Sequence, residues 1–198
     1  WGYRETWCHH PLRLGNRLYV GYWHAGFVIL DIDDMRKPRM VSRLDWSPPY
    51  AHPTHTALPI PFPVSGRRLL VVTDEDVRKL RPSPPPFMWI VDISVETNPV
   101  PIATFQVAGI DDMPQPEFTG CHQPAEQVYG TEIPVTWFAN GLRVVDIKNP
   151  HAPREVAYFV PEAPKGFERP SSNDVFLTRE GLIYLVDRQR GMHILERI

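Results

Sequence analysis

The chain has 198 residues, 42% of them hydrophobic, which is enough to bury a core without disulfides. Its net charge of −2, with lysine and arginine scattered, argues against nucleic acid and against an anionic membrane surface as partners. No apolar run approaches the roughly 20 residues of a membrane-spanning helix, and two cysteines make no disulfide framework. We expect a soluble chain as given, with the cytoplasm favoured and the localisation otherwise open.

Short hydrophobic runs separated by turn residues follow one another along the whole chain. The 23 prolines fall between these runs rather than inside them, and no stretch has good helical periodicity. The sequence therefore predicts an all-β protein with at most a turn or two of helix in its loops.

Three segments share one pattern, in which Asp-Ile is followed by proline seven residues after the Asp and by an aliphatic residue ten after it. The segments are 28–44, 89–105 and 143–159, with the aspartates Asp31, Asp92 and Asp146. Each predicts a strand, a turn that ends at the proline, and a returning antiparallel strand. We interpret the three aspartates as turn formers that bind backbone amides.

Another strand precedes each repeat, at 17–23, 68–74 and 133–138, and a fourth unit follows at 182–197. Repeating units of about four short strands are typical of propeller blades. We predict a β-propeller of four-stranded antiparallel blades, about four in this chain, as a single domain over 1–198. The approximate blades are 8–46, 52–107, 119–160 and 171–198.

Residues 1–7 are a candidate strand that closes the ring against 191–197. The alternatives are that the chain is the C-terminal part of a larger ring, or that a second chain, such as another copy, completes the ring.

The segment from Gly141 to Val156, GLRVVDIKNPHAPREV, resembles the LVIVD repeat, which belongs to a family of bacterial β-propeller proteins. The phrases HTALP, LLVVTDE, SNDVF and GLIYLVDR are also similar to that family. The resemblance covers nearly the whole chain and implies the propeller fold. It implies little about chemistry, because a fold does not fix a function.

Histidines recur where the innermost strands are predicted to begin. Alignment of Pro11 with Pro124 gives the starts Cys8-His9-His10, Thr54-His55-Thr56, Cys121-His122-Gln123 and Ser172-Asn173-Asp174. Equivalent positions of successive blades surround a common axis, so His9, His55 and His122 are predicted to meet there. His10 replaces His9 if the register differs by one residue. Three neutral imidazoles suit a divalent transition metal such as Zn, Fe, Mn or Cu.

The turns between the second and third strands are predicted on the same face as these histidines. They contribute Trp23, His24, Asp74, Glu75, Trp137, Asn140, Asp187 and Arg188. Long loops at 74–87, 107–120 and 160–172 overhang this face. We name as candidate catalytic residues, able to orient a ligand or move a proton, Asp74, Glu75, Glu126, Asp174, Asp187 and Arg188.

Other unusual residues have plainer interpretations. His24, His52, His151 and His193 are expected to be satisfied polar residues outside the site. Cys8 and Cys121 share one blade position, where burial as small apolar residues is favoured over metal ligation.

Two functions remain open at this point. The first is a metal-dependent hydrolase, lyase or oxidoreductase that acts on a small organic substrate in an axial pocket. The second is a non-catalytic propeller that binds a protein or a small ligand through its long-loop face. No Gly-x-Ser-x-Gly or phosphate-binding loop occurs.

Overall fold

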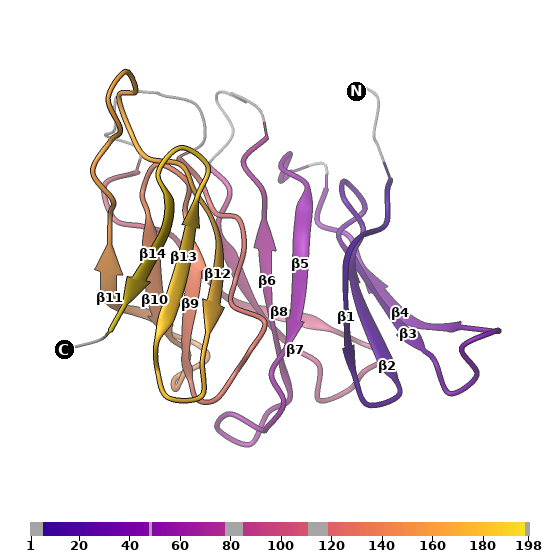
Figure 1. Cartoon of the computed structure of the whole chain (residues 1–198). Helices are drawn as coiled ribbons and strands as arrows, with labels where there is room; N and C mark the ends of the chain where they lie inside the picture. Colours follow the sequence, from indigo (N-terminus) through magenta and orange to yellow (C-terminus); the bar gives the residue numbers. More distant parts are fainter. Residues whose placement is uncertain (1–5, 48, 78–84, 111–118, 197–198) are drawn as a thin grey trace.

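The computed structural model describes the chain except for residues 1–5, 48, 78–84, 111–118 and 197–198. The described part contains fourteen β-strands and no α-helix. They form four antiparallel sheets that follow one another around the molecule (Figure 1), as a propeller requires. The predicted all-β propeller architecture is confirmed.

Blades 1 and 2 are four-stranded meanders whose innermost strands come first in the chain. Blade 1 consists of β1 (His9–Leu14), β2 (Arg17–Gly21), β3 (Phe27–Asp31) and β4 (Arg39–Leu44). Blade 2 consists of β5 (Thr54–Pro59), β6 (Leu69–Asp74), β7 (Met88–Asp92) and β8 (Val100–Phe105).

Blades 3 and 4 have three strands each within the described residues. Blade 3 contains β9 (Glu132–Thr136), β10 (Leu142–Asp146) and β11 (Arg154–Phe159), and blade 4 contains β12 (Ser172–Leu177), β13 (Ile183–Asp187) and β14 (Gly191–Leu195). The closing strand predicted at 1–7 falls mostly on residues outside the described part.

The innermost strand predicted near Cys121 does not form as a regular strand. That segment of blade 3 touches β9 through one isolated bridge between Pro124 and Val135. A proline has no amide to donate to a ladder, and the neighbouring backbone is held instead by His122 N donating to Thr136 O and Thr136 N donating to Gln123 O. The starts predicted near Thr54 and Ser172 are correct, and the start predicted near Cys8 is at His9.

The repeated Asp forms the same turn in three blades. Asp31, Asp92 and Asp146 each accept a hydrogen bond at Oδ1 from the backbone amide two residues later, at 3.0, 2.8 and 2.9 Å. The outer strands β4, β8 and β11 then begin directly after the repeated proline. The predicted turn function of these aspartates is confirmed.

The aliphatic residue ten positions after the Asp is a β-bulge. The register of β3 with β4 passes over Val41, that of β7 with β8 passes over Ile102, and that of β10 with β11 passes over Val156. A bulge leaves one residue unpaired and increases the local twist, so the repeat encodes the bend of the outer strand as well as its turn.

The hydrophobic core lies between blades. Leu70 and Val72 of β6 face blade 1 with Tyr19 and Ile29, whereas Leu69 and Val71 on the opposite side pack in the core cluster that includes blade 3. A third cluster joins Leu142 and Val144 of blade 3 to Val175, Ile183 and Leu185 of blade 4. Strand alternation thus gives each inner blade two apolar faces. The described residues contain no helix long and apolar enough to cross a membrane.

Candidate metal centre

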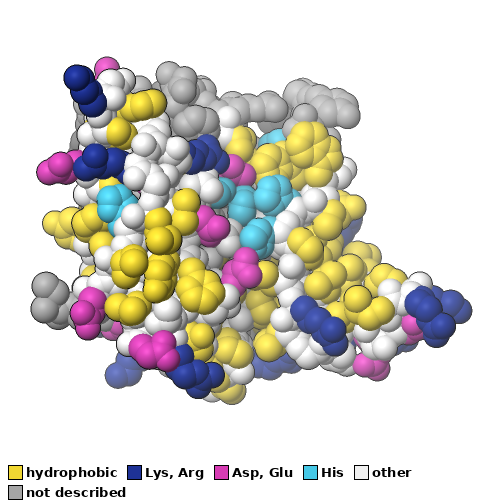
Figure 2. Space-filling view, viewed as in Figure 1, with side chains coloured by type: hydrophobic (Ala, Val, Ile, Leu, Met, Phe, Trp, Pro, Cys, Tyr) yellow, Lys and Arg dark blue, Asp and Glu magenta, His cyan; other side chains and the backbone are white. Residues whose placement is uncertain are grey.

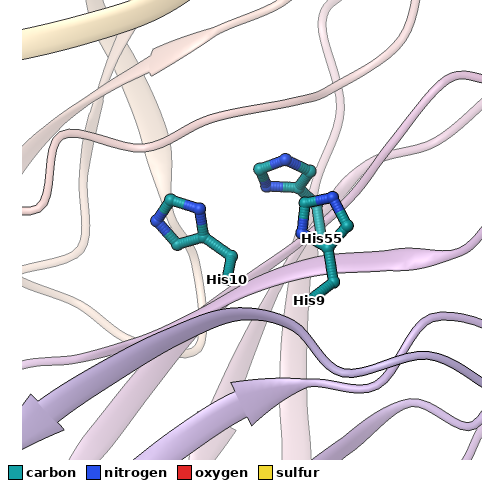
Figure 3. Close-up of side chains that lie close together, drawn as sticks. All are labelled: His9, His10 and His55. Atoms are coloured by element: carbon teal, nitrogen blue, oxygen red, sulfur yellow. The ribbon is translucent and has the colours of Figure 1, made fainter.

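Three inner strands have an irregular register near their first residue, at the predicted position in β5 and β12 and one residue after it in β1. The register of β1 passes over His10, that of β5 passes over His55, and that of β12 passes over Asn173. A bulged residue is released from the ladder, which turns its side chain in a new direction. In blade 1 this brings both His9 and His10 towards His55 (Figure 3).

The histidines form part of a row of rings across the inner ends of the blades. The ring centroid of His55 lies 4.3 Å from that of His9 and 4.2 Å from that of His122. Trp23 stacks on His9 at 4.9 Å, and Phe138 stacks on His122 at 4.7 Å. The aromatic rings hold the imidazoles from both ends of the row.

The four predicted ligands, together with Glu75, which was predicted as a catalytic residue, fall into two overlapping groups that could hold a metal ion, and His9 and His122 share neither group. One group is His9, His10 and His55, and the other is His55, Glu75 and His122. In each group the donor atoms lie within 4.8 Å of one another. The second group is the more buried, and it includes a carboxylate that can balance the charge of a cation.

Hydrogen bonds set the tautomers of His55 and His122 so that both Nε2 atoms carry a lone pair. His122 Nδ1 donates to the carbonyl oxygen of Asn173 at 2.6 Å. Thr56 Oγ1 donates to Gln123 Oε1 at 3.0 Å, so it accepts the hydrogen of His55 Nδ1 at 2.7 Å. Such outer hydrogen bonds are what metal-binding imidazoles require.

The spacing around Glu75 fits ligation. His122 Nε2 lies 3.5 Å from Glu75 Oε1, and His55 Nε2 lies 3.9 Å from Glu75 Oε2. Two donors at roughly 2.1 Å from a tetrahedral ion stand roughly 3.4 Å apart, so only small shifts would bring all three groups to one ion. Glu75 follows β6 directly, and its amide donates to Pro53 O, which fixes its position beside β5.

Burial keeps the two imidazoles neutral. It lowers the pKa of His122 to about 4 and, together with the nearby His122, lowers the pKa of His55 far below its usual value. Burial also raises the pKa of Glu75 to about 7, although Arg188 opposes this shift. A metal would displace no proton from the two neutral Nε2 atoms, whereas Glu75 would release its proton as the ion binds.

His10 and Glu126 form a pair beside this centre. His10 Nε2 lies 2.7 Å from Glu126 Oε1, and Gln123 Nε2 lies 3.3 Å from the same nitrogen. Their side chains retain 26% and 40% of their exposure, so the pair stands at the open side of the buried group. Glu126 would therefore compete with a metal ion for His10 Nε2.

Two other candidate catalytic residues, Asp74 and Asp187, are held by hydrogen bonds within their own blades. Asp74 is buried and accepts hydrogen bonds from Thr54 Oγ1 and Trp89 Nε1. Asp187 accepts from the backbone amides of Ser171, Gln189 and Arg190.

Asp174 is exposed and lines a cavity on blade 4, and Arg188 lies over the ring of Phe138 at 5.0 Å. Neither side chain belongs to the two histidine groups. Arg188 still influences the centre, because its charge acts on the pKa values of Glu75, His55 and His122.

The remaining histidines and the cysteines lie outside both groups. These histidines are His24, His52, His151 and His193. Cys121 is buried, as predicted, and burial raises its pKa well above the usual value. Cys8, directly before β1, is exposed, contrary to the prediction.

Sequence reasoning missed three residues that build the centre. Gln123 connects Thr56 to His10, and Asp76 accepts hydrogen bonds from the amides of Thr119 and Gly120, which anchors the segment that carries His122. Phe138, with a positive φ of 37°, contacts His122, whereas the predicted Trp137 lies in the core. The equivalent Trp23 also has a positive φ, 52°, so the aligned pair Trp23 and Phe138 was the available signal.

Two of the long loops that were predicted to overhang this face are only partly described. Half of the loop at 74–87 and more than half of the loop at 107–120 fall on residues 78–84 and 111–118, outside the described part.

Gly21 also matters for the centre, because a Cβ there would lie 2.2 Å from the backbone oxygen of His55. Only glycine permits blade 1 to approach the start of β5 so closely.

Comparison with solved structures supports the fold. The computationally designed Ika4 protein superposes with a TM-score of 0.60 at 7% identity, over 98% of this chain and 93% of that chain. The periplasmic gluconolactonase PpgL of Pseudomonas aeruginosa superposes with a TM-score of 0.56 at 17% identity, over 88% of this chain. This chain spans 47% of the length of that gluconolactonase. At such identities the likeness concerns the fold alone.

Comparison with sequence families supports the repeat. No curated protein sequence matches the chain. The family model described as the LVIVD repeat matches two regions. Residues 14–45 contain β2 to β4 of blade 1, and residues 129–159 contain β9 to β11 of blade 3. Two regions of the chain therefore match the LVIVD repeat, as the sequence resemblance implied.

Proposed function

We propose that this chain is a metal-dependent enzyme for a small organic substrate, with His55, His122 and Glu75 as the metal ligands. The observation that carries the proposal is the tautomer arrangement, in which both buried Nε2 atoms are lone-pair donors that face the two oxygens of one carboxylate. Two imidazoles and one carboxylate form a common ligand set for Zn²⁺ and Fe²⁺.

A bound ion would supply Lewis acidity and would lower the pKa of a coordinated water, which suits hydrolysis, hydration or oxidation. The residues of the chain supply the remaining functions. His10, whose Nε2 is held by Glu126, can accept or donate a proton at its other ring nitrogen, Nδ1. Arg188 adds a positive charge that favours an anionic substrate or product.

The test is the metal content of protein purified without chelators. We expect about one transition-metal ion per chain, as a single ligand group of this kind predicts. His122→Ala should lose the metal and any metal-dependent turnover of small esters, lactones or hydroxylated substrates. His151→Ala is the matched control, because this exposed histidine lies in the turn before β11, and it should retain both.

The alternative outcome is also informative. Protein that binds no transition metal when titrated, or a His122→Ala variant that binds metal as tightly as the unaltered chain, would contradict the proposed ligand set. A ligand-binding propeller without catalysis would then be the better description, with the ring row as its binding surface.

A further inference from the structure

Blade 4 has one apolar face that is not covered by another described blade. Val175, Ile183 and Leu185 pack against blade 3. The opposite face carries two cross-strand rows, Phe176 with Tyr184 and Ile194, and Asp174 with Val186 and Met192. Phe176, Val186, Met192 and Ile194 remain 42–60% exposed.

Blade 1 has a corresponding face on its other side. Tyr19, Phe27 and Ile29 face blade 2. Strand alternation turns Leu18, Val28 and Leu30 the opposite way, in rows with Arg13, Arg43 and Met40. Met40 is 64% exposed.

The two faces lie on the same side of the molecule. Figure 2 shows hydrophobic side chains over β12–β14 and over β1–β4, with a cluster of histidine side chains between them. Exposed apolar patches of this kind mark contact surfaces. At each of the three boundaries between blades inside the chain, the face of one blade that corresponds to the uncovered face of blade 4 packs on the face of the next blade that corresponds to the uncovered face of blade 1.

We propose that two copies of this chain close head-to-tail into one ring, with blade 4 of each copy packed on blade 1 of the other. The contact continues the packing already present between blades 1 and 2, 2 and 3, and 3 and 4. Two such contacts related by a two-fold axis close the assembly and leave no exposed end.

Charge supports this choice of occupant. A cavity of about 590 Å³ on blade 4 is lined by apolar side chains and by the carboxylates of Glu126 and Asp174. The face of blade 1 presents Arg13 and Arg43 at the edges of its apolar rows. Acidic groups on one end and basic groups on the other favour contact between unlike ends and oppose contact between like ends.

The test uses one substitution on each face. Met192→Asp alters blade 4 and Met40→Asp alters blade 1, and each places a carboxylate in the proposed contact. By mass measurement in solution, the unaltered chain should be a dimer, and each variant alone should be a monomer. Burial of an unpaired charge should raise the dissociation constant by about 100-fold or more.

Mixing the two variants distinguishes head-to-tail contact from other dimers. A mixed dimer retains one contact between two unaltered faces, so it should form where neither variant dimerises alone. Val95→Asp is the control, because Val95 is 61% exposed in a turn of blade 2, and it should remain dimeric. Circular dichroism establishes that the variants are folded.

Several results would overturn the proposal. These are a monomeric unaltered chain, a dimer that survives either substitution, and a mixture of folded monomeric variants that stays monomeric. The inference does not depend on the proposed metal, because the oligomeric state can be measured with metal present or absent.

Discussion

Blades 2 and 4 carry similar apolar patterns but differ in how much of them is buried. Every residue of β5 and β6 is buried, whereas no residue of β14 is buried. Yet β13, like β6, has apolar side chains on both faces: Ile183 and Leu185 on one, Tyr184 and Val186 on the other. The difference shows that burial of a blade depends on its neighbours as well as on its sequence.

The same contrast holds at the inner ends of these blades. Blade 2 supplies His55 and Glu75 to the candidate centre, and blade 4 supplies only the carbonyl oxygen of Asn173 and the charge of Arg188. The blade that is enclosed on both faces is therefore also the one that carries most of the donor atoms.

The largest expected effect tests burial directly. Leu70→Ala in β6 should lower the free energy of unfolding by about 2–5 kcal/mol, because it leaves a cavity between blades 1 and 2. Ile194→Ala in β14 should change it by less than about 0.5 kcal/mol in dilute, separated copies. Denaturant unfolding measures both values. Equal effects would mean that blade 4 is as enclosed as blade 2.

The second prediction compares equivalent inner positions. His55→Ala should weaken transition-metal binding by about 100-fold or more, since outer hydrogen-bond partners of metal ligands alone contribute roughly 10–100-fold. Asn173→Ala should have little effect, because the atom of Asn173 that contacts His122 is its backbone oxygen. Competition with a chelator of known affinity gives the two constants. Similar losses in both variants would argue for a centre that includes blade 4.

Sequence reasoning predicted the parts of this architecture that depend on local chemistry. The Asp turn and the proline before each outer strand are set within eight residues, so the repeat revealed them. The repeat showed an aliphatic residue at a constant position, Val41, Ile102 and Val156, but it did not show that this residue is bulged. Aliphatic residues are common in paired and bulged positions alike.

The candidate centre was predicted in its residue types but not in its exact members. Alignment placed His9, His55 and His122 together, but it could not decide whether Asp74 or Glu75 faces them. That choice depends on the direction of the chain where β6 ends, and the structure directs Asp74 to Trp89 and Glu75 to the histidines. The shift from Trp137 to Phe138 has the same origin in a positive φ.

The third prediction concerns the close approach of blade 1, at Gly21, to the backbone of β5 in blade 2. Gly21→Ala should lower the free energy of unfolding by about 1–3 kcal/mol, because its Cβ would press on the backbone of His55. Metal affinity should fall with it, since β5 must move. Gly130→Ala is the control, because a Cβ at that position meets no atom within 4 Å. Thermal unfolding with and without added metal separates the two effects, and identical behaviour of both variants would contradict the close approach.

The smallest expected effect concerns a charge network that links blades 1 and 2. Glu96 accepts hydrogen bonds from Arg68 at 2.8 Å and from Arg17 of blade 1 at 3.2 Å. Partial burial alone would raise the pKa of Glu96, but the two arginines outweigh it and hold this pKa below its usual value. Glu96→Gln should therefore lower the free energy of unfolding at neutral pH by about 0.5–1 kcal/mol.

The pH dependence of that difference follows from the lowered pKa. A carboxylate with a depressed pKa in the folded state stabilises the fold at pH values above its unfolded pKa, and this contribution is lost as the pH falls through the folded pKa. The unaltered chain and Glu96→Gln should thus differ at pH 7 and converge as the pH falls below about 4.5, the usual glutamate range. Glu180→Gln, in the exposed turn between β12 and β13, should show no such convergence. Added salt should shrink the Glu96 difference, because the arginines of both blades are partly exposed. A difference that is unchanged down to pH 3 would mean that the amide, rather than the charge, accounts for the contact between the blades.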